Sequence, residues 1–197
     1  MLDRSLPYIP VVMRTRGAAL HPRFSLPEGY VLSGYRGGFD LAWARIETAA
    51  GEFKNPEDAV PVFRRDFPDE ALRPSRCLFA LAPDGLPVAT VSLWESDKLG
   101  PVLPRVHWVA TDPAHECRGL CKALLTAAMD VAARAYPGLP VFLTTQTTSW
   151  PAVRLYRRFG FEPVWERPAH WTGDWQPTEA WDIIDRKIEA FNTSHKG

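Results

Sequence analysis

Two basic residues and a glycine stand directly at the start of a helical pattern in the middle of the chain. The turn covers residues 115–119 (HECRG), and Lys122 follows in the first turn of the expected helix. Backbone N–H groups at a helix start have no acceptor within the helix, the helix dipole favours negative charge there, and Gly119 lets a ligand approach the backbone. The pattern indicates either a phosphate or pyrophosphate site or an ordinary turn.

Three further side chains could transfer protons. Tyr156 lies on the apolar face of a short helical pattern, so it is either a core residue or a proton donor. Glu47 falls in another helical pattern and is either a base or a solvated helix carboxylate. His107 falls in a strand pattern two residues before Val109, on the same side by period-two alternation, and is either a base or a structural histidine.

A strand-helix-strand-helix series must position these residues. Residues 105–111 have the β-branched and aromatic content of a strand, and apolar spacings of four, three and four predict a helix over about 120–136. Residues 141–147 predict a buried strand, after which Pro151 begins a helix that ends at Gly160. Two strands joined by a helix are expected to pair in parallel.

The preceding part of the chain predicts an antiparallel region with two helices. Asp84-Gly85 between two strand-forming runs is typical of a hairpin. Asp40 and Asn55 are expected to cap the two helices, and a proline in residues 8–14 predicts an edge strand there. The expected strands and helices lie at 30–35, 41–50, from 56 to about 67, 77–81 and 88–94.

Residues 109–123, followed by residues 152–161 (AVRLYRRFGF), form a pair of motifs. The second fits A-x-x-L-Y-x-x-x-G-F, with Tyr156 four residues before Gly160. The pair resembles the GCN5-related N-acetyltransferase (GNAT) superfamily over about residues 29–166. The resemblance implies an α/β (α+β) fold of the acyl-CoA N-acyltransferase type. Its central sheet is mixed, with antiparallel N-terminal strands and a parallel cofactor-binding strand-helix-strand unit.

The same resemblance implies a single domain over residues 1–197. An extra strand is expected within residues 1–28, the core at about 29–166, and a C-terminal extension with a helix in 167–197. Acetyl-CoA is then the acyl donor, and no metal is expected. The positions that match cofactor-binding residues of the family are Val109, Ala110, Thr111, Cys117, Arg118, Gly119, Leu120, Cys121, Lys122, Ser149 and Tyr156.

The resemblance also implies a reaction. Tyr156 matches the family tyrosine that protonates the leaving thiolate, and the N–H of Val109 would polarise the thioester carbonyl. An amine with a pKa near 10.4 is mostly protonated at neutral pH, so a base, Glu47 or His107, is expected to accept its proton. The expected acceptor is a primary amine of a small molecule, with a peptide amine second, attacking directly in a ternary complex.

Two residues depart from the family pattern. Glu116 stands where glutamine or arginine belongs, and Cys121 stands where a small residue belongs. They leave a second function open, a non-catalytic acyl-CoA-binding sensor or interaction module. Cys117 and Cys121, four apart at a helix start, are either reactive thiols or plain turn residues. Ser149 replaces a frequent asparagine, and its hydroxyl is expected to cap the last helix of the motif.

Bulk composition excludes several partners. The 23 basic and 23 acidic residues balance, which argues against a nucleic-acid surface or an anionic membrane. No apolar run approaches about 18 residues, no signal-peptide pattern begins the chain, and three cysteines favour a reducing cytoplasm. An apolar stripe in the final helix needs a partner, either this subunit or a second copy in a homodimer. The residues of this stripe are Trp181, Ile184, Ile188 and Phe191.

The histidines predict no metal site, because they are dispersed and lack metal-ligand spacing. They are His21, His107, His115, His170 and His195.

Overall fold

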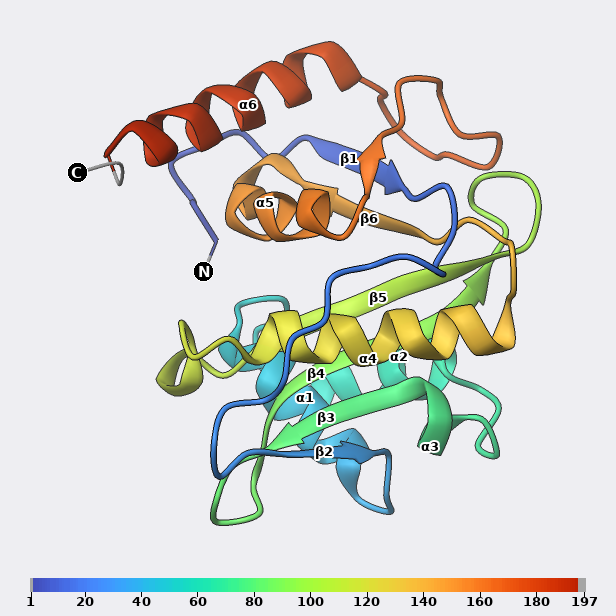
Figure 1. The fold of residues 1–197 in the computed structure, drawn as a ribbon, viewed down its shortest axis with the longest axis vertical. Helices are drawn as coiled ribbons and strands as arrows, with labels where there is room; N and C mark the ends of the chain where they lie inside the picture. The colour runs from blue at the N-terminus through green and yellow to red at the C-terminus, as the bar shows by residue number, and fades with distance from the viewer. Residues whose placement is uncertain (1, 195–197) are drawn as a thin grey trace. The chain divides into compact units, whose positions relative to one another are not determined.

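The structure is a computed structural model in which residues 2–194 are described. Its strands are hydrogen-bonded in the order β2-β3-β4-β5-β6-β1-β7, and the sheet is mixed, as predicted (Figure 1). The elements in chain order are β1 (Pro10–Arg14), β2 (Val31–Gly34), α1 (Phe39–Ala49), α2 (Pro56–Asp66), α3 (Arg73–Arg76), β3 (Cys77–Leu81), β4 (Pro87–Ser96), β5 (Leu103–Thr111), the 3-10 turn η1 (Pro113–His115), α4 (Leu120–Ala135), β6 (Phe142–Gln146), the 3-10 turn η2 (Thr147–Ser149), α5 (Trp150–Arg158), β7 (Glu162–Pro163) and α6 (Pro177–Ser194).

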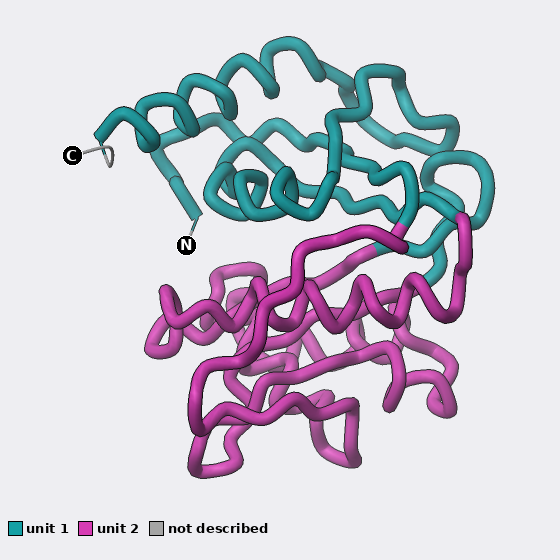
Figure 2. The backbone as a smooth tube through the Cα atoms, viewed as in Figure 1, with its two compact units in different colours: residues 1–17, 95–105, 139–197 teal, residues 18–94, 106–138 magenta. Residues whose placement is uncertain are grey.

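The chain forms two compact units, coloured separately in Figure 2. Unit 1 comprises residues 1–17, 95–105 and 139–197, and unit 2 comprises residues 18–94 and 106–138. Each unit has its own cluster of buried apolar side chains. The candidate cofactor turn lies in unit 2, whereas Tyr156 lies in unit 1.

Strands β2, β3 and β4 of unit 2 form the expected antiparallel series. The hairpin between β3 and β4 is the predicted Asp84-Gly85 turn, in which Asp84 Oδ1 accepts the N–H of Leu86 at 3.0 Å. Gly85 has φ +84°, a conformation that side chains disfavour. Turn chemistry therefore sets the register here.

Helices α1 and α2 pack against each other over an aromatic core. Trp43 of α1 lies 5.3 Å from Phe63 of α2, measured between ring centroids, and both are fully buried. Asn55 caps α2 as predicted by accepting the N–H of Asp58 at 2.9 Å. The prediction that Asp40 caps α1 is wrong, because the helix begins earlier, after Gly38, and Asp40 lies in its first turn.

Helix α4 crosses the strands of unit 2 on the side opposite α1 and α2 (Figure 1). It packs against β3 through a continuous apolar stripe. Its length and start match the prediction, and Tyr136 follows at its C-terminal end. This packing holds α4 in place on the sheet, and its N-terminus lies directly after the candidate turn.

In unit 1, β6 pairs in parallel with β5 at Phe142 and Arg105, as predicted for a strand-helix-strand unit. Strand β1 lies between β6 and β7 and pairs antiparallel with both, so the predicted edge position is wrong. The single proline begins the strand at Pro10, where a missing N–H is tolerated, and does not interrupt it.

Helix α6 buries its apolar stripe within its own chain. Trp181, Ile184 and Ile188 are buried, and Phe191 lies 5.7 Å from the ring of Trp150 at the start of α5. Arg157 of α5 forms an ion pair with Asp185 at 2.6 Å. Of the two predicted partners for the stripe, the structure shows the chain's own body.

Candidate functional site

Strand β5 is distorted at Trp108, directly before Val109. Trp108 has φ 51°, which is unusual for a residue with a side chain. Its indole Nε1 donates to Asp66 at 2.9 Å, and its ring packs against Trp43 and Phe53. These contacts hold the backbone in its strained conformation and fix where Val109 lies.

The turn after β5 leads into a helix start without a side-chain cap. Gly119 is the N-cap of α4, has φ 86° and offers no side chain to the first-turn N–H groups. A Cβ at Gly119 would lie 2.7 Å from Lys122 Cε, so the end of the lysine side chain would have to shift, and the φ of 86° disfavours any side chain at this position. Cys117 also has a positive φ, of 59°. An uncapped helix start of this kind is suited to binding an anion, and residues 115–122 are called the cradle below.

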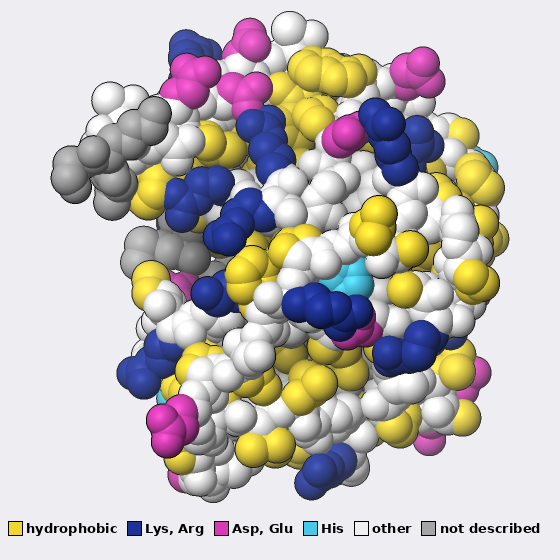
Figure 3. Space-filling view, in the orientation of Figure 1, with side chains coloured by type: hydrophobic (Ala, Val, Ile, Leu, Met, Phe, Trp, Pro, Cys, Tyr) yellow, Lys and Arg dark blue, Asp and Glu magenta, His cyan; other side chains and the backbone are white. Residues whose placement is uncertain are grey.

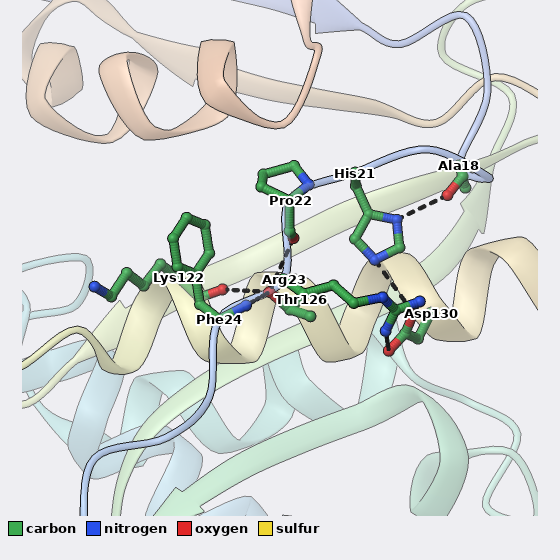
Figure 4. A network of polar contacts seen from close by, with 8 residues as sticks. All are labelled: Ala18, His21, Pro22, Arg23, Phe24, Lys122, Thr126 and Asp130. Carbon is green, nitrogen blue, oxygen red and sulfur yellow. Dashed lines mark hydrogen bonds and ion pairs between the residues drawn. The ribbon is translucent and has the colours of Figure 1, made fainter.

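Lys122 is held within this cradle by the segment that precedes β2. Its Nζ lies 5.1 Å from the ring centroid of Phe24, a cation–π contact. Phe24 N–H donates to Thr126 Oγ1 on the next turn of α4 at 3.1 Å, and His21 contacts Asp130 at 3.2 Å (Figure 4). The segment is thus fixed along α4, and it positions the lysine.

Two contacts anchor the turn from outside. Arg45 of α1 forms an ion pair with Asp112 at 2.7 Å and also donates to the carbonyl of Pro87. The hydroxyl of Tyr30 lies 2.8 Å from Nδ1 of His115. Sequence analysis missed both partners, because no local pattern joins Arg45 to a turn that lies 67 residues further along the chain.

Cys121 faces the strand behind the turn. Its Sγ lies 3.1 Å from Thr111 Oγ1. Burial raises the pKa of the Cys121 thiol, which for this residue favours the alternative of a plain turn residue over a reactive thiol. Cys117 is exposed, and all three cysteines are free.

His107 contacts a carboxylate that sequence analysis did not single out. Its Nε2 lies 3.3 Å from Asp66 Oδ2, and Arg65 Nε donates to Asp66 Oδ1 at 2.8 Å. Burial raises the pKa of Asp66, but hydrogen bonds from His107, Arg65 and Trp108 outweigh it and hold that pKa well below its usual range. Asp66 therefore stays ionised beside the imidazole.

Glu47 is 1% exposed, so the alternative of a solvated helix carboxylate is wrong. Within the described residues its Oε1 has no hydrogen-bond partner. Burial and the nearby charge of Glu52 raise the pKa of Glu47 well above its ordinary value. A base with a raised pKa suits proton transfer near neutral pH.

Tyr156 and Ser149 lie in unit 1 on and directly before α5. Tyr156 is 6% exposed, and its ring lies 6.0 Å from that of Phe161. The expected capping role of Ser149 is wrong: its Oγ accepts a hydrogen bond from Gln146 Nε2 at 2.9 Å and makes no cap to α5. Helix α5 instead begins with Pro151 in its first turn.

The part of the chain that the structure describes contains neither a metal-ligand cluster nor a membrane-spanning helix. There, no cluster of three or more His, Cys, Asp or Glu side chains is arranged to hold a metal ion, and His195 lies outside that part. No helix of residues 2–194 is long and apolar enough to cross a membrane. Basic and acidic side chains are both spread over the face in Figure 3.

The sequence profile of the "Acetyltransferase (GNAT) family" matches residues 42–161, which include most of α1 and all of β5, the cradle, α4 and Tyr156. The chain belongs to the GNAT acetyltransferase family. This match confirms the resemblance found in the two motifs. The comparison with curated proteins gives no match.

Solved structures share the fold, two of them described as GNAT acetyltransferases. A GCN5-related N-acetyltransferase from Sphaerobacter thermophilus is 25% identical, with a TM-score of 0.62, over 80% of this chain and 50% of its own. An acetyltransferase of the GNAT family from Colwellia psychrerythraea is 12% identical, with a TM-score of 0.61, over 81% and 55%. A Pyrococcus horikoshii protein is 15% identical, with a TM-score of 0.58, over 75% and 93%. The chain thus spans about half the length of the first two.

Proposed function

We propose that this GNAT chain transfers the acetyl group of acetyl-CoA to a primary amine, by direct attack in a ternary complex. The observation that supports this most is the start of α4, which has no side-chain cap. Gly119, with φ 86°, leaves the first-turn N–H groups uncovered, and the side chain of Lys122 adds a positive charge beside them. The pyrophosphate of CoA has the charge that such a cradle favours. The cofactor-binding positions predicted from the sequence surround it, except Ser149 and Tyr156 on and before α5.

The proposed chemistry uses two side chains, a base and Tyr156, and one backbone group. An ammonium releases one proton to a base, His107 or Glu47, and the neutral amine attacks the thioester carbonyl carbon. The N–H of Val109 stabilises the developing oxyanion. As the C–S bond breaks, the sulfur takes the hydroxyl proton of Tyr156, which the second N–H proton of the amine replaces through solvent.

A small-molecule amine is the proposed acceptor, and a peptide amine is the second candidate. The half-buried rings of Phe53 and Trp108 stack beside His107, with centroids 5.4 Å apart. Such rings favour an acceptor with an apolar body, and the carboxylate of Glu52 favours its cationic nitrogen.

The second function, a non-catalytic acyl-CoA-binding module, is favoured by Glu116 and Cys121 in the cradle. A negative charge or a larger side chain there would weaken phosphate binding. Against it, the Cys121 side chain is directed to Thr111 on β5. That contact leaves the backbone N–H groups of the turn as the surface for the phosphates.

Calorimetric titration of the reduced protein with acetyl-CoA tests the cofactor. Free CoA, ATP and NADH are the comparison ligands. Micromolar binding that prefers acetyl-CoA over ATP and NADH is expected, since the cradle, the strand and Tyr156 would then act on one ligand. Equal or absent binding of all four would contradict the cofactor assignment.

A further inference from the structure

Asp66, the last residue of α2, is bonded to the histidine proposed as a base. Its Oδ2 accepts from Trp108 Nε1 at 2.9 Å and lies 3.3 Å from His107 Nε2. We infer that Asp66 is a positioning residue, which fixes the orientation and the tautomer of the His107 ring for the proposed role of His107 as a base. The inference rests on the proposed function and deepens it.

The placement of the pair suits this role. The His107 and Asp66 side chains are 20% and 17% exposed, so the pair is shielded but within reach of a ligand. Exposed ion pairs contribute little because both side chains are free to move. Here the carboxylate is fixed by contacts to three side chains, including Arg65 at 2.8 Å on its other oxygen.

The same carboxylate supports the distorted backbone next to the histidine. Trp108 keeps φ 51° while its ring packs between Trp43, at 5.2 Å, and Phe53, at 5.4 Å. Its indole N–H ends on Asp66. Asp66 thus couples the His107 ring to the strand segment that leads to Val109.

The charge of Asp66 determines which ring nitrogen carries the proton. Three hydrogen bonds hold the pKa of Asp66 well below its usual range, despite the opposing effect of burial, so the group is an acceptor without a proton of its own. The nitrogen facing it, Nε2, must then donate, and the neutral ring has its basic lone pair on Nδ1. When Nδ1 takes a proton, the carboxylate stabilises the resulting cation.

The inference is tested without an activity assay by 15N NMR of histidine-labelled protein. His107→Gln identifies the His107 resonances. In the native chain the neutral ring is expected as the Nε2–H tautomer. In Asp66→Asn the ring is expected to titrate at lower pH and to lose that tautomer preference, because the neighbouring charge is gone.

A matched control is Asp40→Asn, which removes an ion pair at 3.1 Å between α1 and Arg64 of α2, the helix that also carries Asp66. It is expected to leave the His107 titration unchanged. Asp66→Glu keeps the carboxylate and is expected to keep the native tautomer, so it tests the inference even if Asp66→Asn folds poorly. Identical His107 tautomer and titration in native and Asp66→Asn protein would overturn the inference.

Kinetics distinguish failure of the inference from failure of the proposed function. With an amine that the native protein acetylates, Asp66→Asn is expected to lower kcat about 10–100-fold. The acidic limb of the pH profile of kcat/KM should shift, and the KM for acetyl-CoA should stay unchanged. A His107→Gln variant that keeps its native rate would overturn the assignment of the base. The NMR result for Asp66 is read separately from that outcome.

Discussion

Two of the candidate proton-transfer residues, Tyr156 and Glu47, are buried side chains. Tyr156 is buried on α5 and is the proposed proton donor. Glu47 is buried without a hydrogen-bond partner for Oε1 among residues 2–194. A buried and unpaired carboxylate destabilises a fold unless it gains a proton or serves a function. These two residues therefore give distinct experimental predictions.

Tyr156→Phe is expected to lower kcat by about 10–1,000-fold, the usual range for loss of a general acid. Acetyl-CoA binding should survive, because only one hydroxyl is removed. Steady-state kinetics with a titration of acetyl-CoA measure both quantities. Tyr8→Phe, at a side chain that is 70% exposed, is the matched control. A native rate in Tyr156→Phe would remove this residue from the mechanism.

Glu47→Gln is expected to stabilise the fold at neutral pH by about 1–3 kcal/mol, since it removes a carboxyl group that ionises readily in the unfolded chain but is kept from ionising by burial in the folded chain. Because the pKa of Glu47 is raised in the folded chain, its contribution is greatest below its ordinary pKa and is lost as pH rises towards the folded value. The difference between variant and native Tm should therefore grow above about pH 4.5. A constant difference would contradict the burial argument.

At the scale of elements, turn residues and apolar periodicity were enough to predict most of the structure. The helix at α4, the hairpin at Asp84-Gly85 and the cap at Asn55 follow from local chemistry, so the sequence alone predicts them. The start of α1 was missed because Gly38, with φ 86°, ends the preceding turn one residue before Phe39. A glycine in this conformation outweighs the capping preference of Asp40.

The candidate site was predictable in part for the same reason. The cradle consists of consecutive residues, and its helix start is readable from the chain. Asp66 was not singled out, because its partner Trp108 lies 42 residues away and only the packing of α2 against β5 brings them together. Ser149 was assigned the wrong bond because Gln146 competes for its hydroxyl.

Gly119→Ala is expected to weaken acetyl-CoA binding by about tenfold or more. The new methyl group would meet Lys122 and would oppose a positive φ, which costs about 1 kcal/mol or more. Gly37→Ala, where nothing lies within 4 Å, is the matched control for loss of a glycine. Titration calorimetry of both variants measures the effect. Equal affinities would mean that the cradle does not bind the cofactor.

At the scale of the whole molecule, the family match shows a GNAT acetyltransferase domain, and the balanced charge argues against a nucleic-acid partner. Helix α6 stabilises unit 1 by covering α5, the helix that carries Tyr156. The homodimer expected from its apolar stripe stays a prediction. Trp181, Ile184 and Ile188 of the stripe are buried within the chain, so they need no second copy to cover them.

Ile184→Ala is expected to lower stability by about 2–5 kcal/mol, because a fully buried side chain leaves a cavity. For a chain of this size the Tm should fall by roughly 5–15 °C. Size-exclusion chromatography with light scattering should give the same mass for native and variant protein. A change of mass with little loss of Tm would show that α6 joins two copies.

The most direct measurement of the central claim is amine-dependent release of CoA thiol from acetyl-CoA, across a panel of apolar and polar primary amines. The proposed function predicts release that needs both substrates, favours small apolar amines and falls strongly in Tyr156→Phe. Tight binding of acetyl-CoA with no release for any amine would contradict it. The chain would then be an acyl-CoA-binding module on a GNAT fold.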